Sequence, residues 1–179
     1  MNHSIYRTAL TYALTGILCF WVSTNVHAES QVKLEQNKTL VMEAFAALDA
    51  GVLNDLDKYI TADYVRHCQA TPGVIIHSLE DFKALLQAWS HTYSDVETKA
   101  DVLVAEGDLV AFYGSFTATQ IGPMGPFPAT GKQMVSEFAG YHRITNGKIS
   151  ETWVTWDNLA ALAQLGLFPP PEQKAPVSD

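Results

Sequence analysis

The chain has 179 residues, of which 47% are hydrophobic and 17% are charged, and its formal net charge is −8 at pH 7. A chain of this length suits one domain that buries a sizeable core. Because nucleic acids and anionic membranes repel an acidic surface, we expect neither of them as a partner.

Residues 1–28 have the form of a secretory signal peptide. Arg7 gives a weakly basic start, residues 13–22 form an apolar core too short to span a bilayer, and Val26 and Ala28 are small residues that a signal peptidase accepts. We predict cleavage after Ala28, which gives a periplasmic or secreted protein without a stable membrane anchor; an uncleaved anchor is the alternative. Cys68 would then be the only thiol of the mature chain.

Three segments of helical character follow. Residues 37–50 place apolar side chains along one stripe, with Asn37 as the expected N-cap and Gly51 at the position after the C-cap. A shorter helix is predicted over residues 53–60. Ser78 with Asp81 resembles a capping box, which opens a third helix with its own apolar side.

From residue 96 onward the pattern is that of β-strands. Strands are predicted over residues 96–105, 109–119, 132–145 and 148–156, after a brief strand over residues 64–68. A last helix over residues 158–165 ends at Gly166, and we expect the Pro-rich, charged tail 169–179 to be flexible. This order favours an α+β fold, a cone-shaped α+β barrel with N-terminal helices packed on a curved antiparallel sheet. The open mouth of such a cone is a natural small-molecule site.

Asn146-Gly147 predicts a tight hairpin between the last two strands. Both central residues of a type I′ turn need a positive φ, which this pair tolerates best. If no bulge intervenes, the turn sets the register, and alternate side chains share one face. The residues predicted to face one another are Thr145 and Lys148, His142 and Glu151, Gly140 and Trp153, Phe138 and Thr155, and Ser136 and Asp157.

Several short motifs, each weak alone, occur in a fairly specific order. They are Tyr64-Val65-Arg66-His67, Ala118-Thr119-Gln120-Ile121-Gly122, Pro128-Ala129-Thr130-Gly131-Lys132, Gly147-Lys148-Ile149-Ser150-Glu151-Thr152-Trp153 with Asp157, and Gln164-Leu165-Gly166.

In this order the motifs resemble those of the SnoaL-like polyketide cyclase (ester cyclase) family of the nuclear transport factor 2-like superfamily. The resemblance covers residues 29–168. It implies a cone that is often dimeric through its sheet, and cofactor-free acid/base chemistry on a polyketide ester. The family commonly has His where Gln120 stands.

Three residues are our candidates for catalysis. Asp157 is the candidate for proton transfer, because a carboxyl group held in an apolar cone can reach the pKa that a general acid/base needs. It also directly precedes the last helix, so a purely structural N-cap is an equal alternative. His142 would stabilise the oxyanion that forms at the carbonyl. Glu151, facing His142, would orient the imidazole ring; an ordinary cross-strand polar pair is the alternative.

Six further residues are candidates for ligand binding. The resemblance places His67 at the pocket, although a partly exposed strand-end histidine is the alternative. Gln120 could donate a hydrogen bond to a carbonyl or enolate oxygen. Aromatic rings could clamp a flat ligand by stacking, while an ordinary aromatic core is the alternative. These rings belong to Trp153, Phe138, Phe112 and Phe116.

The sequence therefore predicts an exported enzyme that enolises an apolar carbonyl compound. We expect a small hydrophobic carbonyl-bearing molecule as the ligand and a homodimer as the assembly. No cofactor is expected, and the scattered histidines predict no metal site. A non-catalytic carrier of a hydrophobic ligand and an isomerase or dehydratase on the same fold are the alternatives.

Overall fold

The computed structural model describes residues 30–168, so the predicted signal peptide and the predicted tail lie outside the described residues. The chain divides into two compact units, Met1–Gln36 and Asn37–Asp179. The described end of the first unit, residues 30–36, is helical. The second unit contains the sheet and the other elements of secondary structure. No helix among residues 30–168 combines the length and the apolar character that crossing a bilayer requires.

Local signals place the ends of most helices. The first helix covers residues 30–49 and ends before Gly51, whose φ of 66° fits the left-handed position after a C-cap. The predicted N-cap at Asn37 is wrong, because Asn37 lies inside this helix and no helix-breaking residue precedes it from residue 30 onward. A 3₁₀ helix, η1, covers Leu53–Lys58. In α2 (Leu79–Ser90), the hydroxyl of Ser78 accepts a hydrogen bond from the Asp81 amide, as predicted.

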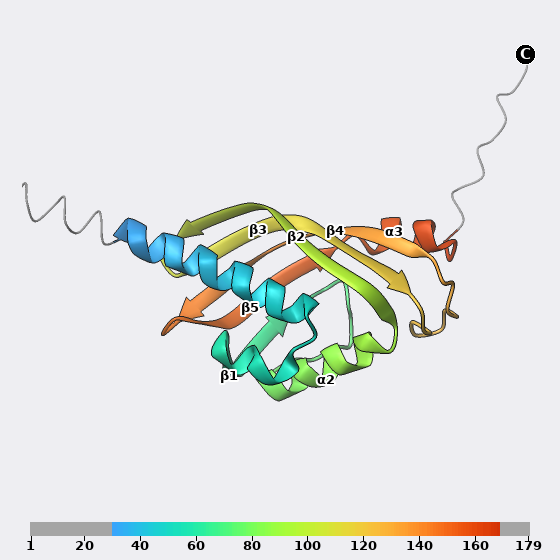
Figure 1. Cartoon of the computed structure of the whole chain (residues 1–179), viewed down its shortest axis with the longest axis horizontal. Coiled ribbons are helices and arrows are strands. Elements are labelled where there is room, and N and C mark those ends of the chain that lie inside the picture. Colours follow the sequence, from blue (N-terminus) through green and yellow to red (C-terminus); the bar gives the residue numbers. More distant parts are fainter. Residues whose placement is uncertain (1–29, 169–179) are drawn as a thin grey trace, which may run out of the picture. The chain divides into compact units, whose positions relative to one another are not determined.

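Five strands form one mixed sheet in the order β1-β5-β4-β3-β2. The pairs β2–β3, β3–β4 and β4–β5 are antiparallel as predicted, whereas β1 runs parallel to β5 at the edge. The direction of β1 could not be predicted, because its pairing joins residues far apart in the sequence. Figure 1 shows α2 and η1 beside β1, with α3 (Asn158–Leu165) beyond the far end of β5. The strands are β1 Ile60–His67, β2 Tyr93–Glu106, β3 Leu109–Gln120, β4 Gln133–Thr145 and β5 Lys148–Trp156.

The sheet curves around an aromatic core. At Gly114 an added Cβ would lie 1.9 Å from the Lys99 carbonyl oxygen, and at Gly140 it would lie 2.1 Å from the Trp153 carbonyl oxygen. Only glycine allows so close a backbone approach within a strand, which is how a sheet bends sharply. Phe45 of the first helix packs edge-on against Phe112 and its neighbours on the concave face. The predicted α+β cone is therefore confirmed.

The β4–β5 hairpin contains a bulge. Asn146 and Gly147 have φ values of 52° and 75°, as a type I′ turn requires, and Thr145 pairs with Lys148 as predicted. Beyond Ile144 and Ile149, however, the register shifts by one, leaving Ser150 as the extra residue. Its hydroxyl donates to the Arg143 carbonyl at 3.3 Å and lies 2.9 Å from the Thr145 hydroxyl. These side-chain bonds replace part of the interrupted ladder.

This bulge makes the predicted register beyond the turn wrong. His142 pairs with Thr152 instead of Glu151, Gly140 pairs with Val154 instead of Trp153, and Phe138 pairs with Trp156 instead of Thr155. The Asp157 amide donates to the Glu137 carbonyl, so Asp157 does not face Ser136. Because side chains alternate along a strand, the one-residue shift moves Glu151 and Trp153 to the convex face.

Candidate functional site

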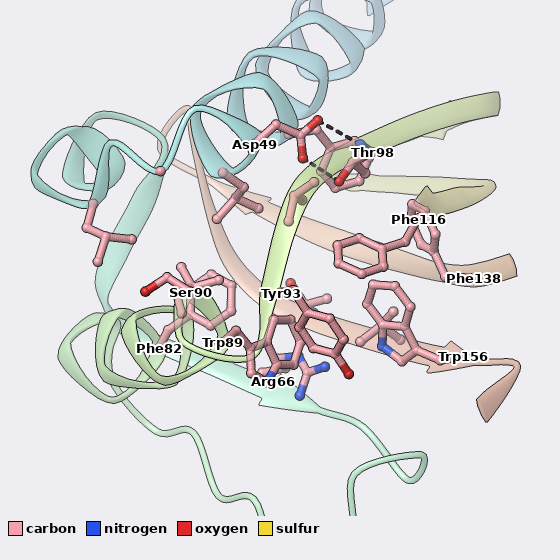
Figure 2. A pocket seen from close by; sticks show the side chains of 18 of the residues that line it. Asp49, Arg66, Phe82, Trp89, Ser90, Tyr93, Thr98, Phe116, Phe138 and Trp156 are labelled. Atoms are coloured by element: carbon pink, nitrogen blue, oxygen red, sulfur yellow. Dashed lines mark hydrogen bonds between the residues drawn. The ribbon is translucent and has the colours of Figure 1, made fainter. Parts of the chain in front are cut away.

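A cavity of about 400 Å³ lies between α2, the end of the first helix and the concave face of the sheet. This volume lies within the usual range of small-molecule sites. Figure 2 shows Phe116, Phe138 and Trp156 on one side and Phe82 with Trp89 on the other. The rings of Phe138 and Trp156 stack with their centroids 5.0 Å apart. Flat, largely apolar walls of this kind suit a flat, largely apolar ligand.

A row of polar side chains crosses the apolar floor of this cavity. Arg66 of β1 pairs in register with Thr152 of β5, and Thr152 pairs with His142 of β4. Tyr64, two residues before Arg66, faces the same side, and its hydroxyl is hydrogen-bonded to Thr152. All four residues are buried and line the cavity. The polar row therefore consists of Tyr64, Arg66, Thr152 and His142.

The imidazole of His142 is held in its neutral form. Burial lowers its pKa from 6.5 to about 3, because the charged ring would lose its hydration. Nδ1 lies 2.8 Å from the Thr152 hydroxyl oxygen, which fixes the orientation of the ring, and the Phe112 ring packs against it at 4.5 Å. Burial also raises the pKa of the Tyr64 hydroxyl to about 12, so the tyrosine remains protonated.

Three side chains in the cavity wall have a buried polar atom without a hydrogen-bond partner among residues 30–168. These atoms are Nη2 of Arg66, Nε2 of His142 and Nε1 of Trp156. Buried polar atoms in folded proteins are nearly always paired, so each exception requires an explanation. A ligand that supplies hydrogen-bond partners would explain all three.

Within residues 30–168, two carboxylates line the cavity, and each already accepts a hydrogen bond from a neighbouring side chain. Asp49 accepts hydrogen bonds from the amide and the hydroxyl of Thr98, at 2.7 and 2.6 Å (Figure 2). Asp95 is exposed, and its carboxylate accepts from the Ser94 hydroxyl at 2.9 Å. Its φ of 52° is uncommon for a residue other than glycine and places a tight bend at this edge of the cavity. Neither carboxylate belongs to the polar row.

Four of the predicted site residues lie together in the cavity. His142 provides the imidazole, and Phe112, Phe116 and Phe138 provide aromatic walls. Phe116 and Phe138 both contact the Trp156 ring, with centroid distances of 5.5 and 5.0 Å. The aromatic face predicted from strand alternation therefore serves as core and as cavity wall together.

Glu151, His67 and Trp153 lie on the convex face, away from the cavity lining. Glu151 accepts from His67, whose Nε2 lies 2.8 Å from the carboxylate, so its partner is not His142. Arg143 lies 3.5 Å from the same carboxylate. The Trp153 ring is stacked between His67 at 4.8 Å and Tyr141 at 4.6 Å. The predicted grouping of these side chains with His142 is wrong because of the Ser150 bulge.

Asp157 and Gln120 also lie outside the cavity lining. The Asp157 carboxylate accepts from the Ala160 amide at 2.9 Å, which makes it the N-cap of α3. The fully buried Gln120 uses both ends of its amide: Nε2 donates to the Pro128 carbonyl at 3.2 Å, and Oε1 accepts from Thr130 at 2.7 Å. Gln120 therefore holds the loop after β3.

The sequence interpretation missed Tyr64, Arg66 and Thr152. Strand alternation turns either Tyr64 and Arg66 or Val65 and His67 toward the cavity. The resemblance placed His67 at the pocket, whereas the structure places Tyr64 and Arg66 there. Thr152 was missed because the predicted register without the bulge sets Glu151, and not Thr152, opposite His142. No three His, Cys, Asp or Glu side chains gather into a metal-binding group within residues 30–168.

The comparisons with known proteins agree with this geometry. The family model for the SnoaL-like polyketide cyclases matches residues 39–165. No curated protein matches the chain. Among solved structures, TsrD from Streptomyces laurentii is similar at 26% identity, with a TM-score of 0.67, over 75% of this chain and 97% of that one. IdmH from Streptomyces antibioticus, described as a candidate polyketide cyclase, is similar at 27% identity, with a TM-score of 0.66, over 73% and 99%.

A candidate polyketide cyclase from Acidithiobacillus ferrooxidans shares the fold at 23% identity, with a TM-score of 0.67, over 73% of this chain and 94% of that one. The described part of the chain combines that fold, a cavity on the concave face of the sheet, and the family match over residues 39–165. The chain belongs to the SnoaL-like polyketide cyclase family.

Proposed function

We propose that the protein enolises a flat, mostly apolar carbonyl compound in the cavity, with His142 as the group that carries the proton. The observation that carries the proposal is the unpartnered Nε2 of a buried, neutral imidazole whose Nδ1 is fixed by Thr152. Membership of a family named for polyketide cyclases supports a small carbonyl-bearing ligand. The aromatic walls support a flat one.

The proton transfer follows from the hydrogen bond at Nδ1. In the tautomer whose Nδ1–H donates to Thr152, Nε2 presents a lone pair and accepts the proton from the carbon next to the carbonyl. The C–H electron pair forms the C=C bond, and the carbonyl oxygen becomes an enolate. Burial alone disfavours an imidazolium, but the enolate formed in the same step compensates its charge. Returning the proton to the carbon completes the cycle without a cofactor.

Deuterium exchange tests this function directly. The bicyclic ketone 2-tetralone, dissolved in D₂O with the protein, should lose its α-hydrogen signals in the NMR spectrum faster than in buffer. His142→Phe should slow this exchange by at least about 100-fold, as removal of a general base does, while calorimetry still detects binding. His91→Gln, at an exposed position after α2, is the control and should exchange like the wild type. Equal exchange in the wild type and His142→Phe would contradict the role of His142.

The second candidate function is a carrier that holds an apolar compound without reacting with it. It is favoured by the positions of two predicted catalytic carboxylates, since Asp157 caps α3 and Glu151 bonds to His67 on the convex face. The same experiment separates the two functions. A carrier would bind 2-tetralone and leave its rate of deuterium exchange at the value measured in buffer.

The protein is also proposed to be exported and to form a homodimer through the convex face of its sheet. The signal-like residues 1–28 support export to the periplasm or beyond, with Glu29 as the first residue of the mature chain. Mass spectrometry of protein from cells tests this point, and a mature chain that retains residues 1–28 would contradict it.

A row of convex-face side chains crosses all five strands and supports a homodimer. In register, this row is Val104, Ala111, Tyr141, Trp153 and His67.

A further inference from the structure

Arg66 is a buried cation without an acidic partner. Its side chain lines the cavity and is only 7% exposed. Nη1 donates a long hydrogen bond of 3.3 Å to the Thr71 hydroxyl, and Nη2 has no partner. No carboxylate of residues 30–168 forms an ion pair with it. A buried, unpaired charge costs roughly several kcal/mol, so a guanidinium in this position requires a reason.

The surroundings of Arg66 leave room for an anion from outside the chain. Its guanidinium carbon lies 5.9 Å from the centre of the Trp89 ring, which covers one side of the planar group. The uncharged Tyr64 and Thr152 are its neighbours in the polar row. Of the lining carboxylates, Asp49 is bonded to Thr98, and the exposed Asp95 accepts from Ser94. Figure 2 shows Arg66 near Trp89 among the cavity side chains.

From this arrangement we infer that the ligand carries a carboxylate, which binds to the Arg66 guanidinium while the flat apolar part fills the aromatic end of the cavity. A guanidinium presents its N–H donors in a planar fork that matches a carboxylate. The inference rests on the proposed function, because it names the class of molecule that the same cavity takes. It adds that an aromatic keto acid fits the site better than a neutral ketone or ester of the same shape.

The experiment compares two probes of nearly equal shape, 2-naphthylacetate and 2-naphthylacetamide, by isothermal titration calorimetry. The wild type should bind the carboxylate about 10- to 100-fold more tightly than the amide, as expected for a charge-assisted hydrogen bond in a desolvated site. In Arg66→Met this preference should vanish, with the affinity for the amide unchanged within about threefold. Without ligand, Arg66→Met should melt no lower than the wild type, because the substitution removes an unpaired buried charge.

Arg143→Met is the matched control. Arg143 lies on the convex face beside Glu151 and is not among the residues that line the cavity, so the preference for the carboxylate should persist in this variant. The comparison of the two probes on the wild type needs no variant, and therefore stands even if Arg66→Met fails to fold.

Each remaining outcome overturns a defined part of the inference. Equal affinities of the wild type for the two probes would overturn the carboxylate while leaving ligand binding in the cavity intact. A preference that survives in Arg66→Met would overturn the role of Arg66. If the wild type binds neither probe, the cavity proposal fails as well. The carboxylate preference alone can also be absent. In that case, deuterium exchange into 2-tetralone that depends on His142 would still support the proposed enzyme.

Discussion

At the scale of single residues, His142 carries the clearest physical signature. It lies among Phe45, Phe112 and Thr152, and its pKa of about 3 results from burial alone. The unfolded chain restores the ordinary value of 6.5. As the pH falls below 6.5, the unfolded state therefore binds a proton that the folded state does not, and this difference destabilises the fold down to about pH 3.

We predict that His142→Phe removes this dependence. Between pH 7 and pH 5, the wild type should lose about 2 kcal/mol more unfolding free energy than the variant, because 1.5 pKa units separate pH 5 from the unfolded value. Urea denaturation at a series of pH values measures the difference. His91→Gln serves as the control and should follow the wild type. Parallel stability curves for the wild type and His142→Phe would show that the imidazole is accessible to water.

The residue scale also shows what a sequence leaves undetermined. Arg66 and His67 are neighbours in one strand, and the register in which β1 pairs with β5 decides which of them faces the cavity. That register joins residues more than eighty positions apart, as the His67–Glu151 contact illustrates. His142 and the three phenylalanines could be predicted, because they alternate regularly along β3 and β4.

At the scale of elements, the prediction succeeded where the signals are local. The bounds of β5 and α3 match the predicted ranges 148–156 and 158–165, because an Asn-Gly turn, an Asp cap and a Gly stop enclose them. The Ser150 bulge could not be predicted from the same signals. Its energy depends on hydroxyl bonds to Thr145 and Arg143, which exist only once the hairpin has formed.

The α3 cap yields an element-scale prediction. Asp157→Ala should lower the unfolding free energy by about 1 kcal/mol, because the Ala160 amide loses its acceptor. Asp157→Asn should retain most of the stability, since its side-chain oxygen still accepts that bond. Urea denaturation measures both variants, and the 2-tetralone assay should find Asp157→Asn as active as the wild type. Loss of exchange with unchanged stability in Asp157→Asn would instead restore Asp157 as the proton carrier.

At the scale of the whole molecule, the two faces of the sheet differ in the side chains that they present. The concave face holds the cavity and the polar row, and the convex face displays exposed apolar side chains such as Val102, Val104 and Tyr113. Contiguous apolar surface on a sheet marks a site of association. The family resemblance points to the same face as a dimer contact.

We predict a dimer in solution that depends on this face. Tyr113→Glu should convert the dimer to a monomer, because the substitution buries a charge in the contact. Multi-angle light scattering measures the molecular mass of each variant. Gln87→Glu, which adds the same charge on an exposed position of α2, is the control and should stay dimeric. A wild type that is monomeric at all concentrations tested would contradict the predicted assembly.

The extra residue Ser150 has a consequence for how this hairpin tolerates change. Ser150 is the residue of β5 without a partner in β4, so deleting it would leave Glu151 opposite Arg143 and Thr152 opposite His142, as they are now. A regular ladder that kept Ser150 would instead set Glu151 opposite His142 and turn its carboxylate toward the cavity. An irregularity in the backbone, and not the choice of side chains, therefore keeps this acid out of the interior.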